Sequence, residues 1–188
     1  MEFITLVNKD SVNLVKDVLM YPLKVNRDTS GILVETLRTD WKEIYGKDRE
    51  FAMQYFSVTK SGVARDEDVW HYHPNQEDRF IVAQGAIVTA IADYRKDSPT
   101  FGLLNLFYAQ SQIDPFILLI PNKTLHGFMV VSTQPAILLN FPTSLYNPKE
   151  ERRISYDRAQ IKESDGSSFS WNHVREEFSL KHASNEKV

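Results

Sequence analysis

Apolar residues in the middle of the chain come in short runs separated by turn-forming residues. The segment 79–95 (RFIVAQGAIVTAIADYR) contains two runs, and the Gln-Gly pair at 84–85 between them predicts a β-hairpin. Further apolar runs lie within 98–109, 115–121 and 127–141, each bounded by Pro, Gly or Asn. Short strands at intervals of about 8–12 residues are typical of a β-sandwich or a small barrel.

The two ends of the chain have a different pattern. Residues 10–21 predict a short helix capped by Asp10 or Ser11. Residues 39–48 predict a second helix, capped by Thr39 or Asp40 and ended by Gly46, and residues 170–188 predict one helical turn and a polar tail. Without an internal repeat or a linker, the chain is expected to form one domain: N-terminal strands and helices over 1–50, a barrel core over 51–157 and a C-terminal segment over 158–188.

Composition narrows the class of protein. The chain has 22 Lys and Arg against 25 Asp and Glu and has no basic run, which argues against a nucleic-acid binder. No window approaches the roughly 18 apolar residues of a membrane span, and the first twenty residues lack the pattern of a secretory signal. Cysteine is absent, so disulfides and thiolate chemistry are excluded. We therefore expect a cytoplasmic protein that binds neither nucleic acid nor membrane.

The stretch 70–80 (WHYHPNQEDRF) holds two of the five histidines. Residues two apart on a strand face the same way, so His71 and His73 should project together, and Glu77 keeps this parity if the strand resumes after the proline. His126 follows about fifty residues later. The pattern resembles the two motifs of the cupin superfamily, whose metal-binding members hold one divalent transition metal with such residues. The corresponding set here is His71, His73, Glu77 and His126.

Longer segments resemble one family more closely. The stretches QYFSVTKSGVAR (54–65), ADYRKDSPTFG (92–102), IPNKTLHGFMVVS (120–132) and LYNPKEERRISYD (145–157) are similar, in this order, to motifs of the dTDP-4-dehydrorhamnose 3,5-epimerases. The resemblance covers roughly residues 22–157. It implies an all-β, cupin-type double-stranded β-helix (a jelly-roll barrel) with short flanking helices, assembled as a homodimer. It also implies metal-free, cofactor-free proton abstraction next to the keto group of a dTDP-4-keto-6-deoxy sugar.

The resemblance also implies roles for individual residues. His71 falls on the catalytic base and His126 on the second active-site histidine. Arg65 falls on the arginine that contacts the diphosphate, a role that suits a guanidinium group. The remaining substrate-binding positions lie around the nucleotide or near the bound ligand; they are Glu35, Gln54, Asn140 and Tyr146.

The positions at which this chain differs from the family pattern include those that carry out the chemistry. Asn140 replaces the tyrosine that reprotonates the sugar, and His73 replaces a glutamine. The enolate-stabilising lysine aligns near Asp78, with Arg79 as a possible substitute. The aspartate that orients the base would lie near the C-terminus, where this chain has His182, and Glu176 or Glu177 could take over its role. Asn140 also lies on an apolar strand, where a buried amide needs partners. Three functions therefore stay open: a nucleotide-sugar epimerase or isomerase, a metal-dependent cupin (a dioxygenase or isomerase), and a non-catalytic nucleotide-sugar binder.

Overall fold

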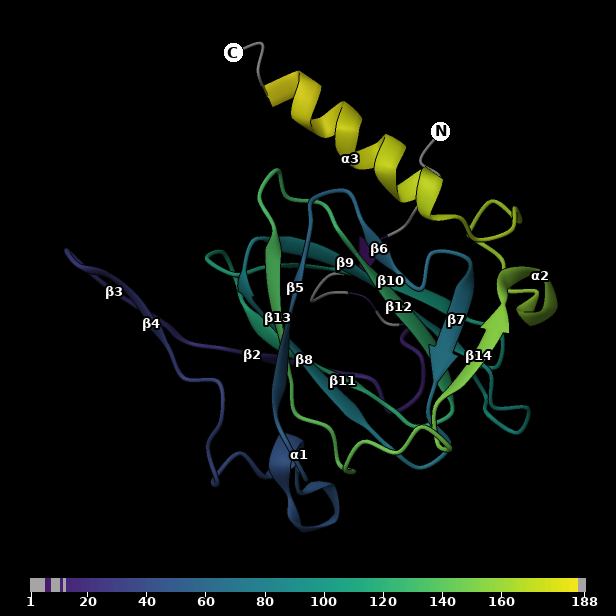
Figure 1. The fold of residues 1–188 in the computed structure, drawn as a ribbon, viewed down its shortest axis with the longest axis horizontal. Coiled ribbons are helices and arrows are strands. Elements are labelled where there is room, and N and C mark those ends of the chain that lie inside the picture. Colours follow the sequence, from purple (N-terminus) through teal and green to yellow (C-terminus); the bar gives the residue numbers. More distant parts are fainter. Residues whose placement is uncertain (1–5, 8–10, 12, 186–188) are drawn as a thin grey trace.

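Two facing β-sheets form the body of the molecule, as the computed structural model shows for residues 6–7, 11 and 13–185, with side chains as far as Phe178 (Figure 1). Within these residues one sheet has seven strands, in the order β1-β10-β9-β12-β7-β14 with β6 paired to β12. Its strands are β1 (Leu6–Val7), β6 (Ala64–Arg65), β7 (Val69–Tyr72), β9 (Ala86–Asp93), β10 (Leu104–Gln110), β12 (Thr124–Val130) and β14 (Arg152–Ser155).

The second sheet has five strands among the described residues, in the order β2-β11-β8-β13-β5. Its strands are β2 (Leu19–Pro22), β5 (Tyr55–Thr59), β8 (Asp78–Gln84), β11 (Phe116–Ile120) and β13 (Ala136–Asn140). A separate two-stranded hairpin, β3 (Val25–Asp28) and β4 (Gly31–Val34), projects away from the barrel (Figure 1). The predicted all-β jelly roll with short flanking helices is confirmed.

The hairpin predicted at 84–85 is wrong. β8 and β9 follow each other in sequence but lie in opposite sheets, because β8 pairs with β11 and β13 whereas β9 pairs with β10 and β12. Gly85, with φ +78°, forms the corner between the sheets, and a Cβ there would lie 3.1 Å from the Cα of Ala136. A corner and a hairpin share the same local signature of glycine between apolar runs, so only long-range pairing separates them.

The apolar runs are continuous because both faces of several strands are buried. Between the sheets, Phe80, Phe107 and Val130 belong to one core cluster. On the outer side of the five-stranded sheet, Ile81 packs in a second cluster with Ile44 of the short helix α1 (Lys42–Tyr45). Adjacent residues of one strand thus enter different cores.

Helix α1 confirms part of the prediction for 39–48. It ends at Gly46 as predicted, and a 3₁₀ turn, η1 (Lys47–Arg49), follows it. Its N-cap is Trp41 rather than Thr39 or Asp40, and the Asp40 carboxylate pairs with Arg38 instead.

The predicted helix over 10–21 is wrong in its described part. A turn precedes β2, and the backbone N–H of Val15 donates to Asn105 Oδ1 at 2.7 Å. The side chains of Val15 and Val18 enter the core between the sheets. Tertiary contacts here override a local helical pattern; Asp10, one of the two proposed caps, lies outside the described residues.

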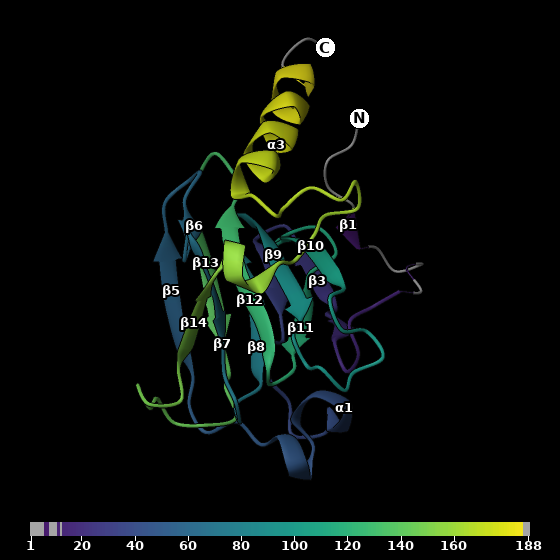
Figure 2. The same ribbon diagram turned by 90° about the vertical axis from the view of Figure 1, so that its right-hand side faces the viewer.

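The C-terminal segment is more ordered than the single turn predicted. It forms α2 (Tyr156–Ala159) and the 15-residue α3 (Trp171–Asn185), which extends past one end of the barrel (Figure 2). Trp171 anchors α3 in the cluster on the outer side of the seven-stranded sheet. His173 Nδ1 lies 2.9 Å from the buried carboxylate of Glu163, so this histidine is more than the surface residue a polar tail would hold. Among the described residues, no helix is long and apolar enough to span a membrane.

Candidate active site

A cavity of about 260 Å³ opens between the two sheets where the apolar core ends. Phe80 and Phe128 border it from the core side, with ring centroids 6.0 Å apart. Most of the other lining residues are polar or ionisable, and they come from both sheets. These residues include Tyr55, Arg65, Asp66, His71, His73, Asp78, His126, Glu151 and Arg153.

Three histidines form the centre of this lining. His71 on β7 is the register partner of His126 on β12, and their rings are stacked with centroids 5.2 Å apart. His73 lies next to them, 4.5 Å from His71 between centroids. One ring nitrogen of each histidine lies within 4.8 Å of the others. The predicted projection of His71 and His73 toward one side is confirmed, and His126 joins them.

The two more buried histidines are neutral at pH 7. Burial lowers the pKa of His126 to about 4, and burial also lowers the pKa of His73. His126 Nδ1 lies 3.3 Å from the carbonyl oxygen of Thr124, which can only accept, so Nδ1 carries the proton and Nε2 is left as an acceptor. His126 therefore presents a lone pair rather than a charge to the cavity.

Two carboxylates flank His71. Asp66 Oδ2 lies 3.5 Å from Nδ1, and Glu151 Oε1 lies 3.9 Å from Nε2. The interaction with His71 lowers the pKa of Asp66 despite the opposing effect of burial. Within the described part of the chain, His71 Nε2 is buried and has no hydrogen-bond partner. A ring oriented by a carboxylate at Nδ1 and unbonded at Nε2 has the arrangement of a general base.

Asp66 directly follows strand β6 and has a left-handed backbone, with φ +59°. Glu176 and Glu177, the candidate replacements for the orienting aspartate, both lie on α3 and neither lines the cavity. A carboxylate five residues before the base was visible in the sequence. The sequence did not show that Asp66 lies close to His71, because this contact depends on the fold. Strands β6 and β7 both pair with β12, and the turn between them brings Asp66 back to His71.

The opposite wall depends on Asn140. Its Oδ1 accepts the backbone N–H of Arg79 at 2.9 Å, and its Nδ2 donates to Asp78 Oδ1 at 2.7 Å and to the Tyr55 hydroxyl oxygen at 2.9 Å. Asn140 is fully buried and does not itself line the cavity; it holds two residues that do. Tyr55 was not predicted from the sequence. The only indication there was the Asn140 amide on an apolar strand, which needs hydrogen-bond partners.

Glu77 does not lie with the three histidines, so the predicted metal-binding set is wrong in including Glu77. Its carboxylate lies 3.3 Å from Arg49 Nε, and its backbone N–H donates to Thr143. Asp78 begins β8, which lies in the opposite sheet from β7, and its Oδ2 lies 3.6 Å from Nε2 of both His73 and His126. The predicted parity between His73 and Glu77 does not hold because the chain crosses from one sheet to the other between β7 and β8, and Asp78 is the carboxylate that faces the cavity.

Arg79, the proposed substitute for the lysine, faces away from the cavity. Its buried guanidinium donates to the carbonyl oxygens of Ile44 and Phe141 beneath α1. The cations that do line the cavity are the predicted Arg65, whose Nε donates to Thr59 Oγ1 at 3.1 Å, and Arg153.

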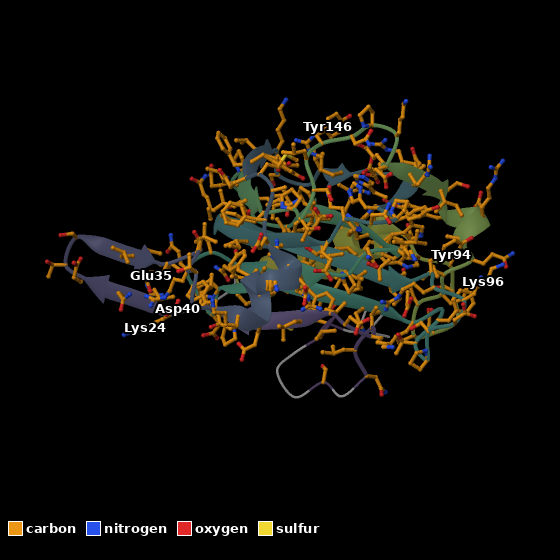
Figure 3. All side chains as sticks on the ribbon, turned by 90° about the horizontal axis from the view of Figure 1, so that it is seen from below. Lys24, Glu35, Asp40, Tyr94, Lys96 and Tyr146 are labelled. Carbon is orange, nitrogen blue, oxygen red and sulfur yellow. The ribbon has the colours of Figure 1, made fainter. Side chains whose placement is uncertain are left out.

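Besides Asn140, three predicted substrate-binding residues do not line the cavity of the single chain. Glu35 follows the projecting hairpin and pairs with Arg38 at 3.0 Å (Figure 3). Gln54 is exposed just before β5, and Tyr146 is 68% exposed on the loop between β13 and β14 (Figure 3).

The histidine cluster fits a metal in its donor chemistry. Three imidazoles, with Asp78 next to two of them, form a mixed nitrogen and oxygen set that suits divalent transition metals. Donors on one ion at about 2.0–2.1 Å must approach more closely than 4.8 Å, so the rings would have to draw together. The neutral state of His73 and His126 is the ligating one.

A cavity lined by histidines at one end of a two-sheet jelly roll defines a cupin-type protein with an enzyme-like site. The chain belongs to the dTDP-4-dehydrorhamnose 3,5-epimerase family, whose model matches residues 13–180.

The relatives agree with this assignment. The chain is 40% identical over 146 residues to the probable low-salt glycan biosynthesis epimerase Agl13 of Haloferax volcanii, covering 76% of this chain and 89% of that protein. A dTDP sugar isomerase from Desulfovibrio desulfuricans has the same fold, with a TM-score of 0.72 at 24% identity over 84% of this chain and 92% of its own. The epimerase from Legionella pneumophila, solved with dTDP-4-keto-L-rhamnose, has a TM-score of 0.65 at 25% identity over 77% and 81%.

Proposed function

We propose that this protein is a nucleotide-sugar epimerase that inverts a carbon next to the keto group of a dTDP-linked 4-keto-6-deoxy sugar. The observation that carries the proposal is the environment of His71, with Asp66 at Nδ1 and an unbonded Nε2 in the cavity. The family, and the dTDP-sugar bound by the Legionella relative, support this substrate class.

The reaction follows from the acidity of a proton α to a carbonyl. His71 Nε2 accepts the proton from C3 or C5, and Asp66 stabilises the resulting imidazolium. His126, neutral and fixed by Thr124, orients the sugar through Nε2, which acts as an acceptor. Arg65 at the cavity wall binds the diphosphate, for which the guanidinium geometry is suited. No cofactor takes part in this scheme.

Deuterium uptake tests the proposal. Incubated in D2O with a dTDP-linked 4-keto-6-deoxyhexose, the protein should incorporate deuterium at C3 or C5, as followed by proton NMR. His71→Asn should lower the rate by at least about 100-fold, whereas His173→Asn, a histidine outside the cavity, should leave it within about 3-fold. If the unmodified protein takes up no deuterium, the proposal is wrong. If it nevertheless binds the nucleotide sugar, it is a non-catalytic binder.

A homodimer is part of the proposal. The hairpin β3–β4 leaves Ile32 and Leu33 exposed, and the edge strand β5 exposes Phe56 (64%) and Val58 (55%) on its outer face. We propose that these apolar surfaces meet between two copies, which would bring Glu35 toward the partner cavity, and that the dimer acts in the cytoplasm. Light scattering should give a dimer for the protein and a monomer for Phe56→Glu; a monomeric unmodified protein contradicts this arrangement.

A metal-dependent activity is the second candidate, favoured by the convergence of the three histidines. His71, His73 and His126 would hold the ion, with Asp78 next to them in place of Glu77. A bound divalent metal would act as a Lewis acid on a substrate oxygen. Elemental analysis after reconstitution with Fe, Mn, Ni or Zn should then find about one equivalent, reduced at least about 10-fold in His73→Gln. Less than about a tenth of an equivalent in the unmodified protein excludes this candidate.

A further inference from the structure

Inversion of a carbon requires that a proton leave one face of the sugar and return to the other. If His71 is the base, as the proposed function holds, the proton donor has to lie across the cavity. His71 and His126 belong to the seven-stranded sheet, on strands β7 and β12. The donor is therefore to be found on the five-stranded sheet.

Three groups of that sheet that carry exchangeable protons line the cavity: Tyr55 and Ser57 on β5, and Asp78 on β8. Asp78 is held as an acceptor, since amide groups of Gln76 and Asn140 both donate to its Oδ1. An aliphatic hydroxyl such as that of Ser57 is a much weaker acid than a phenol. Tyr55 is the remaining donor.

Hydrogen bonds around Asn140 determine where the Tyr55 proton points. The backbone N–H of Arg79 can only donate, so the Asn140 atom that it contacts is the oxygen. The other amide atom is therefore the nitrogen, which directs one N–H to Asp78 and one to the Tyr55 oxygen. Because the phenol oxygen accepts this bond, its own proton is not consumed by Asn140 and is free for the cavity.

We propose that Tyr55 is the proton donor that completes epimerisation and that Asn140 is its positioning residue. Asn140 stands where the epimerase motif has a tyrosine, and Tyr55 is its direct register partner on the neighbouring strand β5. Compared with the epimerase motif, the phenol group is therefore supplied by the neighbouring strand of the same sheet.

The proton balance closes without a co-reactant. The substrate C–H bond breaks, His71 gains the proton, and an enolate forms. The Tyr55 O–H bond then breaks, a C–H bond forms on the opposite face, and a phenolate remains, stabilised by the N–H of Asn140. Tyr55 is 43% exposed, so solvent reprotonates the phenolate, and His71 gives up its proton to solvent after the product has left the cavity. Burial raises the pKa of Tyr55, which keeps the phenol protonated at neutral pH before each turnover.

The test separates deuterium exchange with retention from inversion. In D2O, with a dTDP-linked 4-keto-6-deoxyhexose as probe, Tyr55→Phe should still allow His71 to exchange the proton and return deuterium to the same face. We expect retention exchange within about 3-fold of the unmodified protein and inverted product at least about 100-fold slower. Asn140→Leu should lower the ratio of inversion to exchange by about 10-fold, a change that loss of stability alone does not produce.

Tyr108→Phe is the matched control, because it removes a phenol oxygen that bonds Gln110 outside the cavity; both rates should be unchanged. Inversion by Tyr55→Phe within about 3-fold of the unmodified protein overturns the proposal, and so does equal loss of exchange and inversion in a folded variant. If the unmodified protein neither exchanges nor inverts, the proposed function fails first, which distinguishes the two failures.

Discussion

The two walls of the cavity differ in how completely their polar groups are bonded. On the seven-stranded side, His71 Nε2 has no hydrogen-bond partner within the described residues, and the nearest carboxylates lie at 3.5–3.9 Å from the ring. On the five-stranded side, Asn140 makes three hydrogen bonds of 2.7–2.9 Å. One wall keeps atoms available for a substrate, and the other holds its groups in place. Substitutions on the two walls should therefore affect different quantities.

The largest expected effect on stability is at Asn140. Asn140→Leu removes the partner of the Arg79 N–H and of Asp78 and Tyr55, at about 1–3 kcal/mol for each buried group left unpaired. We expect the free energy of unfolding in urea to fall by about 3 kcal/mol. His73→Gln, on the other wall, should lower it by less than about 1 kcal/mol. Equal losses for the two variants would remove the distinction between the walls.

An intermediate effect is expected at Asp93, outside both walls. Burial acts to raise the pKa of this carboxyl, but hydrogen bonds from Arg95, Ser98 and Thr100 outweigh it and hold the pKa well below its usual range. A carboxyl with a depressed folded-state pKa stabilises the protein above its unfolded pKa of about 3.9, and this stabilisation is lost as the pH falls below that value.

Asp93→Asn should accordingly lower the free energy of unfolding by about 2 kcal/mol at pH 7. The difference from the unmodified protein should shrink as urea titrations are repeated at pH 4 and pH 3. Epimerase activity at pH 7 should stay unchanged, since Asp93 does not line the cavity. A difference that grows toward low pH would contradict the assignment.

The smallest effect is expected at Asp66. Asp66→Asn keeps the size of the side chain but removes the charge that faces His71 Nδ1. We expect kcat to fall about 10-fold with KM and unfolding free energy little changed, because the base loses the stabilisation of its imidazolium. Steady-state kinetics measures this effect. A change confined to KM would assign Asp66 to substrate binding instead.

Residue patterns predicted much of the barrel, since the apolar runs over 98–141 correspond to strands β10 to β13. They did not predict which strands pair. Gly85 fits a hairpin and a corner equally well, and the segment before β2 has a helical pattern that Asn105 and the core override. In both places the deciding partner lies far away in the sequence.

The sequence by itself determined that His71 and His73 face one side, because a strand alternates with a period of two, and the ordered motifs determined the family and the place of His126. Only the tertiary structure decided that Asp78 rather than Glu77 reaches the histidines, since β8 begins at Asp78 in the sheet that faces β7. It also decided that Tyr55 meets Asn140 and that Asp66 meets His71. These contacts depend on strand register and turn geometry, which arise from packing of the whole barrel and leave no local periodic signal.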